Sequence, residues 1–179
     1  RAMLAALEKP HAATIRVGKR VFDLNVTPLF ERRQRIGFVV EWADAKERLL
    51  NLDYEAQFVA VNKAQAVIEF APDGTIRTAN ENFQKATGYS LAEIQGRHHS
   101  MFVEPDYRGS RAYAEFWEHL RRGRFLAGQY KRIGKNGQPV WIEASYNPIL
   151  DINGKVTKVV KFATDITAQV KLLSNFKVL

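Results

Sequence analysis

The side chains of this 179-residue sequence that are able to do chemistry are few, and they form no recognisable catalytic set. His98 and His99 are adjacent. Neighbouring histidines do not easily ligate one metal ion, so we expect a cap or loop hydrogen bond and no metal site. Cysteine is absent, which excludes disulfides, thiolate metal sites and cysteine nucleophiles. Phosphate-binding loops, serine elbow motifs and H-E-x-x-H are also missing, so we expect no catalytic residues and no enzyme.

The formal net charge of +8 raises the question of nucleic-acid binding. The basic residues are scattered, with one group near Arg33 and another near Arg122, and no basic stripe or binding motif is present. No apolar run approaches the roughly 18 residues that a membrane span requires, and no secretory leader opens the sequence. We therefore expect a cytoplasmic protein that contacts neither nucleic acid nor membrane directly.

Two predicted strands, residues 125–133 and 140–147, each carry a face that could bind a ligand. The side chains that share these faces are Gly128, Tyr130 and Arg132 on the first strand and Ile142, Ala144 and Tyr146 on the second. A core built for packing alone more usually carries Leu, Ile or Val where Gly128 and Ala144 stand. We therefore expect an internal pocket with a few polar groups. Arg132 has an alternative place at the rim, in a salt bridge.

Short strands and helices must hold these side chains in place. Runs of β-forming residues at 66–70 and 75–79 flank Asp73-Gly74, which predicts a hairpin. Glycines and capping residues then predict three helices, over residues 80–88, 90–96 and 110–122, with a loop before the last. Three strands follow, over residues 125–133, 140–147 and 158–164. This order predicts an α+β domain with one antiparallel sheet.

A helix is also predicted before this domain, over residues 46–63, where Pro and Gly are absent. Its apolar residues follow two adjacent stripes: Leu49, Leu52, Ala56 and Val59 on one, and Leu50, Tyr54, Phe58 and Val61 on the other. Two stripes make a face wider than a simple dimeric seam, so the helix can contact its own domain and a second copy at once. A helix packed only on one domain is equally compatible with this spacing. After the domain, Asp165 is placed as the N-cap of a further helix.

The last two strands recur near the start of the chain at an offset of 120 residues. V-F-D-L-N-V-T-P-L-F-E at residues 21–31 aligns with W-I-E-A-S-Y-N-P-I-L-D at residues 141–151, and Trp42 falls on Phe162 without a gap. Strand pairs resemble each other by chance, but here the alignment is ungapped across both strands and their turn. We infer that residues 1–45 are the end of a first domain and lack the elements that would cover its sheet.

Residues 64–168 resemble a PAS domain throughout. The resemblance is carried by A-N-E-N-F, T-G-Y-S-L-A-E-I-Q-G, F-W-E-H-L-R-R-G and V-V-K-F-A-T-D-I-T, and H-H-S-M-F-V with V-W-I-E-A-S-Y-N-P-I resembles PAS domains of bacterial methyl-accepting chemotaxis receptors. It implies the PAS fold, an antiparallel five-stranded sheet with short helices on one face, flanked by connecting helices. The expected parts are the C-terminal part of an upstream PAS-like domain (1–45), a connecting helix (46–63), the PAS domain (64–168) and the start of an output helix (169–179).

The resemblance also implies a central cavity and a route for the signal. The candidate ligand-binding residues are Asn80, His99, Trp117, Tyr130, Arg132 and Tyr146, and the candidate relay residues are Asp165 and Thr167. The cofactor stays open between none, haem and FAD. Similar haem-binding domains place the axial histidine near Arg111 rather than at His119. Similar flavin-binding domains often carry a tryptophan where this chain has Arg124-Phe125-Leu126.

The function that follows is sensing of a small ligand or of a redox or oxygen signal, and relay of that signal within a chemoreceptor. The expected partners are a second copy, in a parallel homodimer through residues 46–63, and a downstream signalling domain. Two alternatives stay open. One is a PAS module that regulates a histidine kinase or a cyclic-nucleotide enzyme, and the other is a ligand-free module that dimerises and spaces other domains.

Overall fold

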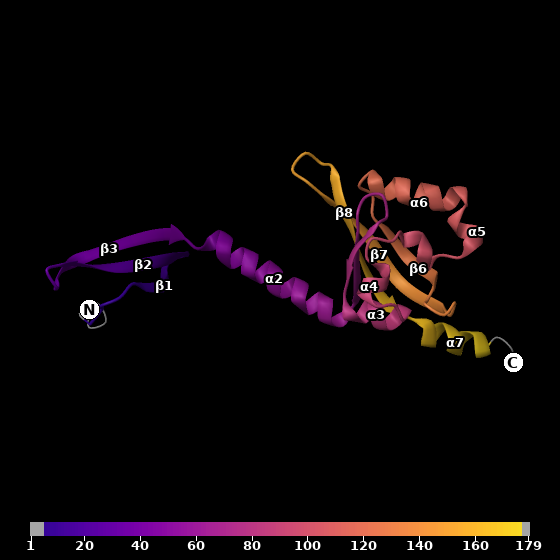
Figure 1. Ribbon diagram of the computed structural model, residues 1–179, viewed down its shortest axis with the longest axis horizontal. Helices are drawn as coiled ribbons and strands as arrows, with labels where there is room; N and C mark the ends of the chain where they lie inside the picture. The colour runs from indigo at the N-terminus through magenta and orange to yellow at the C-terminus, as the bar shows by residue number, and fades with distance from the viewer. Residues whose placement is uncertain (1–5, 177–179) are drawn as a thin grey trace. The chain divides into compact units, whose positions relative to one another are not determined.

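The computed structural model describes residues 6–176 of the chain (Figure 1). The chain divides into two compact units, with the boundary between Val59 and Ala60. Helix α2 (Lys46–Ala64) begins in the first unit and ends in the second, and its bounds agree with the helix predicted over residues 46–63. None of the described helices is both long and apolar enough to cross a membrane.

The first unit contains a three-stranded antiparallel sheet. Its strands are β1 (His11–Val17), β2 (Arg20–Glu31) and β3 (Gln34–Asp44), in the order β1-β2-β3. Arg32 and Arg33 both have positive φ angles, 46° and 70°, and form the tight turn from β2 to β3. Large apolar side chains of this sheet stay exposed, among them Ile36 and Trp42.

The second unit holds a five-stranded antiparallel sheet in the order β5-β4-β8-β7-β6. Its strands are β4 (Ala66–Phe70), β5 (Ile76–Ala79), β6 (Leu126–Ile133), β7 (Pro139–Leu150) and β8 (Val156–Asp165). The segment between β5 and β6 forms α3 (Glu81–Thr87), α4 (Leu91–Ile94), the 3-10 helix η1 (His99–Phe102), α5 (Pro105–Arg108) and α6 (Arg111–Arg121), and α7 (Thr167–Phe176) follows β8. The predicted α+β fold with one antiparallel five-stranded sheet is confirmed.

The strand pairs β2–β3 and β7–β8 share one irregularity. A β-bulge interrupts the first pair after Leu29 and the second after Ile149, 120 residues further along the chain (149 − 29). The cross-strand pairing, however, is shifted by one residue relative to the ungapped alignment. The turns explain the shift, because four residues (31–34) lie between the paired Phe30 and Arg35, whereas five (151–155) lie between the equivalent pair Leu150 and Val156.

The segment between α4 and α6 was expected to be a loop, and that expectation is wrong. It contains η1 and α5, each with a local signal for its start. His98 precedes η1, and its Nδ1 accepts a hydrogen bond from the backbone N–H of Ser100 (3.1 Å), which is the cap bond expected for this histidine pair. Pro105 opens α5 in its first turn, where the missing N–H of proline has no helical partner to lose.

The hairpin between β4 and β5 requires glycine at position 74. Gly74 has a φ of 92°, and a Cβ built there would lie 2.5 Å from His98 Nε2 and 3.0 Å from Trp117 Cζ2. The same His98 Nε2 donates to the backbone carbonyl of Asp73 (2.8 Å), since its Nδ1 is already an acceptor. The turn is therefore fixed against η1 and α6 as well as by its own backbone.

Replacing Gly74 should lower the free energy of unfolding by more than replacing a glycine in an open turn does. We expect Gly74→Ala to lower the free energy of unfolding by about 1–3 kcal/mol, through backbone strain and the displacement of His98. Gly154→Ala is the matched control, because Gly154 also has a positive φ (78°) but no atom lies within 4 Å of its Cβ position. Urea unfolding measures the free energy of unfolding of the two variants. An equal decrease in Gly74→Ala and Gly154→Ala would show that His98 does not constrain the turn.

Candidate functional site

His99 lies at the centre of the second unit and is completely buried. Its Nδ1 is 2.9 Å from the hydroxyl oxygen of Tyr113 on α6, and its Nε2 is 3.2 Å from the hydroxyl oxygen of Tyr146 on β7. Arg132 Nη2, from β6, donates to the same Tyr146 oxygen at 3.0 Å. The four side chains form a continuous hydrogen-bonded chain, the buried polar network, in the order Tyr113, His99, Tyr146, Arg132.

The protonation states in this network follow from its burial. Burial lowers the pKa of His99 well below 6.5, and the nearby charges of Arg132 and Lys161 lower it further, so the imidazole is neutral. Burial also raises the pKa of Tyr146 to about 12, so its hydroxyl keeps its proton. Arg132 can only donate, so Tyr146 accepts from it, and we assign the Tyr146 proton to His99 Nε2 because that nitrogen is the hydrogen-bond acceptor within reach of this buried hydroxyl. His99 then donates from Nδ1 to Tyr113.

Aromatic rings fill the space around the network. Tyr146 meets Phe116 edge to face, with ring centroids 4.9 Å apart, and meets Tyr130 in the same way at 5.4 Å. Trp117 contacts His99 at 5.4 Å, and its buried Nε1 has no hydrogen-bond partner. A cavity of about 10 Å³, which is enough for about one water molecule, lies beside the network and is lined by Arg132, Phe83 and Lys161 among others.

The expectation of an internal ligand pocket beside Gly128 and Ala144 is therefore wrong, because the inner cavity is only about 10 Å³ and is not lined by either residue. Ala144 does lie on the inner face, but rings from α6 and η1 occupy the space above it, and Gly128 lies exposed on β6. Pockets for drug-sized and larger cofactors have volumes of roughly 300–1,000 Å³, so neither flavin nor haem fits this arrangement of side chains. His119 and Arg111 are exposed on α6, and neither faces the interior.

Lys161 is a buried functional group that the sequence analysis missed. It lies on the inner face of β8, only 1% exposed, with Nζ 4.9 Å from the ring centroid of Tyr146 and 5.6 Å from that of Phe83. Burial, and then the charge of Arg132, lower its pKa well below 10.5. The alternation of β8, in which Val159 and Ala163 face the core, was the available signal for its position.

Asn80 was expected among the ligand-binding residues, and the structure places it at the N-terminus of α3 instead of beside His99. Its side-chain oxygen accepts from the backbone N–H groups of Val67 (2.9 Å) and Phe83 (3.0 Å). Its amide nitrogen donates to the backbone carbonyls of Asn62 (2.9 Å) and Gln65 (2.8 Å). The whole hydrogen-bonding capacity of Asn80 thus goes into joining α3, β4 and the end of α2.

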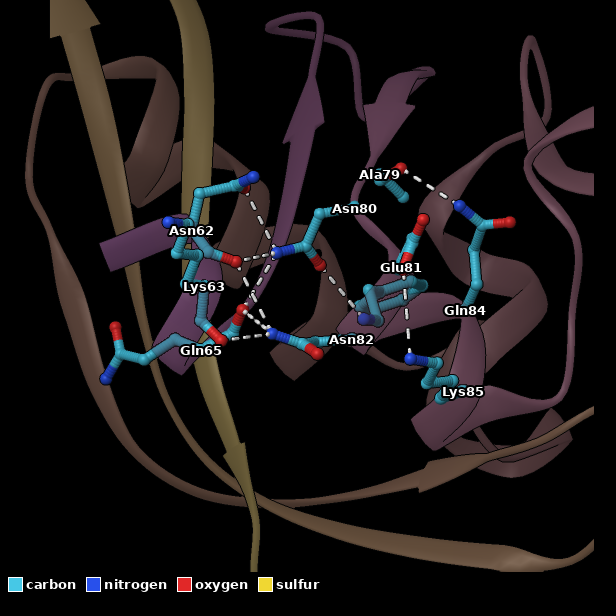
Figure 2. Close-up of polar contacts among 10 residues, drawn as sticks. Asn62, Lys63, Gln65, Ala79, Asn80, Glu81, Asn82, Gln84 and Lys85 are labelled. Carbon is cyan, nitrogen blue, oxygen red and sulfur yellow. Dashed lines mark hydrogen bonds and ion pairs between the residues drawn. The ribbon is translucent and has the colours of Figure 1, made fainter. Parts of the chain in front are cut away.

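Asn82 strengthens this junction, which Figure 2 shows. Its amide nitrogen donates to the carbonyls of Lys63 (3.1 Å) and Gln65 (3.0 Å), beside the bonds made by Asn80. Carbonyl groups in the last turn of a helix have no partner within the helix. The two asparagines therefore cap the C-terminus of α2 from outside, and we call this contact the α2 junction.

Asp165 and Thr167 form a corresponding contact at the start of α7, the α7 junction. Asp165 Oδ1 accepts from the backbone N–H of Thr167 (2.9 Å), and Thr167 Oγ1 accepts from the N–H of Trp141 on β7 (3.0 Å). The backbone N–H of Ile166 donates to the Trp141 carbonyl (2.8 Å). Helix α7 begins at Thr167, so Asp165 stands one residue before the N-cap position expected for it. Of the output helix expected over residues 169–179, residues 177–179 lie outside the described residues.

The buried histidine should make the domain less stable in acid. Below pH 6.5 the unfolded chain protonates His99 whereas the folded chain does not, so the free energy of unfolding falls as the pH falls. We expect the slope below pH 6.5 to be smaller in His99→Gln than in the wild type, by about 1.4 kcal/mol per pH unit. Lys161 contributes in the same direction in both proteins and cancels from the comparison.

Urea unfolding at several pH values between 7.5 and 5.5 measures these slopes. His119→Gln is the matched control, because it removes an exposed histidine from α6, and it should keep the slope of the wild type. A wild-type slope in His99→Gln would mean that His99 takes up a proton in the folded chain.

Comparison with known proteins agrees with this architecture. A family model described as the PAS fold matches residues 76–163. The biofilm dispersion protein BdlA of Pseudomonas aeruginosa is 40% identical over 151 residues, which cover 83% of this chain and 36% of that protein. The aerotaxis receptor of Escherichia coli is 34% identical over 92 residues, which cover 51% of this chain and 18% of the receptor. The chain spans about a third or less of the length of these relatives.

Solved structures show the same fold at lower identity. The PAS domain of a protein from Colwellia psychrerythraea superposes with a TM-score of 0.57 at 21% identity and covers 64% of this chain and 98% of that domain. A light-oxygen-voltage domain studied with a flavin analogue gives a TM-score of 0.53 at 22% identity and covers 67% of this chain and 95% of that one. At identities of 21% and 22%, these structures share the fold with this chain. The sheet order, the matching family model and the relatives agree, and the second unit of this chain is a PAS domain.

Proposed function

We propose that this chain is a sensory PAS module that converts a change in its core into a movement of its flanking helices. The observation that carries the proposal is the buried polar network. A domain that only spaces others is stable with an apolar core, whereas a buried arginine and histidine cost free energy unless every partner is in place. We further propose that His99, Trp117, Tyr130, Arg132 and Tyr146 are the residues that sense the signal.

The connectivity of the sheet supports the relay. Strand β7 carries Tyr146 of the network and Trp141 of the α7 junction, five residues apart. Strand β4 carries Val67, which bonds to Asn80 at the α2 junction, and both β4 and β7 pair with β8. A signal that favours one of two packings of the core shifts their populations by its differential affinity, and the strands carry the difference to both helices. Asp165 and Thr167 are the proposed relay residues.

The relatives support a place in a chemotaxis-type receptor, because one is an aerotaxis receptor and another is a biofilm dispersion protein. The output domain, a cytoplasmic location and the class of signal are part of the proposal. Residues 1–45 are proposed as the end of an upstream PAS-like domain, supported by their strand order and by the bulge after Leu29 that recurs after Ile149. Regulation of a kinase or a cyclic-nucleotide enzyme, or a spacer role, are the competing functions.

Removal of one hydroxyl from the network tests the relay. Tyr146→Phe leaves two buried nitrogens, His99 Nε2 and Arg132 Nη2, without their hydrogen-bond partner, which should lower the free energy of unfolding by about 1–3 kcal/mol. We expect faster amide hydrogen exchange at both junctions, in residues 62–65 and 166–172, relative to the amides of β4. Tyr130→Phe is the control, because its hydroxyl makes no hydrogen bond among the described residues and its ring lies in the same cluster. Faster exchange confined to β6, β7 and η1 would favour the spacer function.

Helix α2 is the proposed surface for a parallel homodimer, since none of its residues is buried and Leu52 and Val59 are each about half exposed. We expect Leu52→Glu with Val59→Glu to convert a dimer into a monomer, because charges at a buried seam are costly. Asn51→Glu with Gln57→Glu adds the same charge at exposed polar positions of α2 and should leave the dimer intact. Analytical ultracentrifugation distinguishes the two, and a fully dimeric Leu52/Val59 variant would exclude α2 as the interface.

A further inference from the structure

Two basic side chains, Arg132 and Lys161, line a small cavity in the described part of the PAS domain. Arg132 is 5% exposed and Lys161 is 1% exposed, and the cavity between them has a volume of about 10 Å³. The rest of its lining is mainly apolar and includes Phe83, Phe102 and Val140. A site of this size holds one water-sized group.

Among the described residues, the protein supplies no counter-charge to either of these basic side chains. Arg132 Nη2 and Nη1 donate to neutral oxygens, those of Tyr146 (3.0 Å) and of the Lys131 backbone (2.9 Å), and its buried Nε has no partner. Among the described residues, no carboxylate forms an ion pair with Arg132 or Lys161, and the salt bridges that do form are at the surface or on its edge. An arginine cannot lose its charge in a protein, and a buried charge without a counter-charge costs several kcal/mol.

Asp165 is the one carboxylate in the lining of the cavity. Its side chain is exposed, and its Oδ1 is engaged with the backbone N–H of Thr167 at 2.9 Å. The acid that could neutralise the cavity is therefore held at the α7 junction. Arg132 and Lys161 therefore line the cavity without an ion pair to this carboxylate.

We propose that this cavity binds a small monovalent anion through one water-sized atom, either a halide ion or one carboxylate oxygen of a compact acid such as formate, held by Arg132 and Lys161. The inference rests on the proposed sensory function, because it names the chemical class of the signal. The anion supplies the missing counter-charge and favours the protonated form of Lys161. It also lies within reach of Asp165, and repulsion between the two negative charges gives the anion a direct effect on the start of α7.

Titration of the full chain with three sodium salts tests the proposal. Chloride and formate are the probes, and gluconate, whose carboxylate belongs to a bulky molecule, keeps the ionic strength constant. Amide chemical shifts of Phe83, Val140 and Ala163 follow the site by NMR. We expect saturable shifts with chloride or with formate and none with gluconate. Saturation by chloride alone assigns the site to halides, and saturation by formate alone assigns it to carboxylic acids.

Lys161→Met should weaken this binding at least tenfold, because methionine keeps the length and apolar stem of the side chain and removes the ammonium group. Lys158→Met is the matched control: Lys158 lies on the same strand but pairs with Glu69 at 2.9 Å, and its loss should leave the anion affinity unchanged. Shifts that are linear and equal for the three salts, or an unchanged affinity in Lys161→Met, would overturn the anion site. The wild-type titration decides the question by itself if that variant does not fold.

Hydrogen exchange in the same samples separates this inference from the function on which it rests. Saturable binding together with slower exchange in residues 166–172 supports both. Saturable binding without any change at the α7 junction supports the anion site and overturns the relay. No binding, with the relay intact in Tyr146→Phe, overturns the anion site alone.

Discussion

The hydrogen bond from Arg132 to Tyr146 is the contact on which the interior of the PAS domain depends. A guanidinium group keeps its charge when it is buried and needs acceptors, and the Tyr146 hydroxyl is the one that a side chain supplies. Once that oxygen accepts from Arg132, its proton points to His99, which in turn donates to Tyr113. A single buried charge thereby fixes the orientation of side chains from β6, β7, η1 and α6.

This network explains why the interior is packed rather than hollow. Aromatic rings pack on every side of His99, and Phe116 also packs against its partners Tyr113 and Tyr146. Enlarging the cavity for a flat cofactor would separate His99 from Tyr113 or Tyr146 and leave buried donors without acceptors. In this domain the PAS fold surrounds a hydrogen-bonded core, and the signals proposed for it are accordingly changes of charge and the binding of species of a few atoms.

Strand β8 is central to the proposed relay because of its place in the sheet. It lies between β4 and β7, it carries Lys161 toward the core, and it ends at Asp165. The strand β4 leads to the α2 junction through Val67, and β7 leads to the α7 junction through Trp141. A displacement of β8 is therefore shared by both neighbours, which gives one buried site access to the helices at the two ends of the domain.

Much of the fold could be predicted because its signals are local. Asp73-Gly74 predicts the hairpin, and Ser110 and Gly123 bound the longest helix of the domain. The alternation along β7 groups Tyr146 with Ile142 and Ala144, and the resemblance to PAS domains correctly turns that face inward. Each of these depends on the conformational preference of a few neighbouring residues, which the sequence states directly. The strand pairing of the first unit was less predictable, since the length of a turn changed it by one residue.

Only the tertiary structure decided which side chains pack against the inner face of the five-stranded sheet. Alternation places Ala144 toward the interior, but it does not say that rings from α6 and η1 fill the space above it. Alternation also does not show that the side-chain amide of Asn80 donates hydrogen bonds to backbone carbonyls at the end of α2. Lys161 is the clearest case, because its polarity favours solvent while its strand position favours the core. Sequence by itself determined the elements and their faces; the contacts among side chains distant in the chain determined the site, because burial and hydrogen-bond partners exist only once the elements are packed.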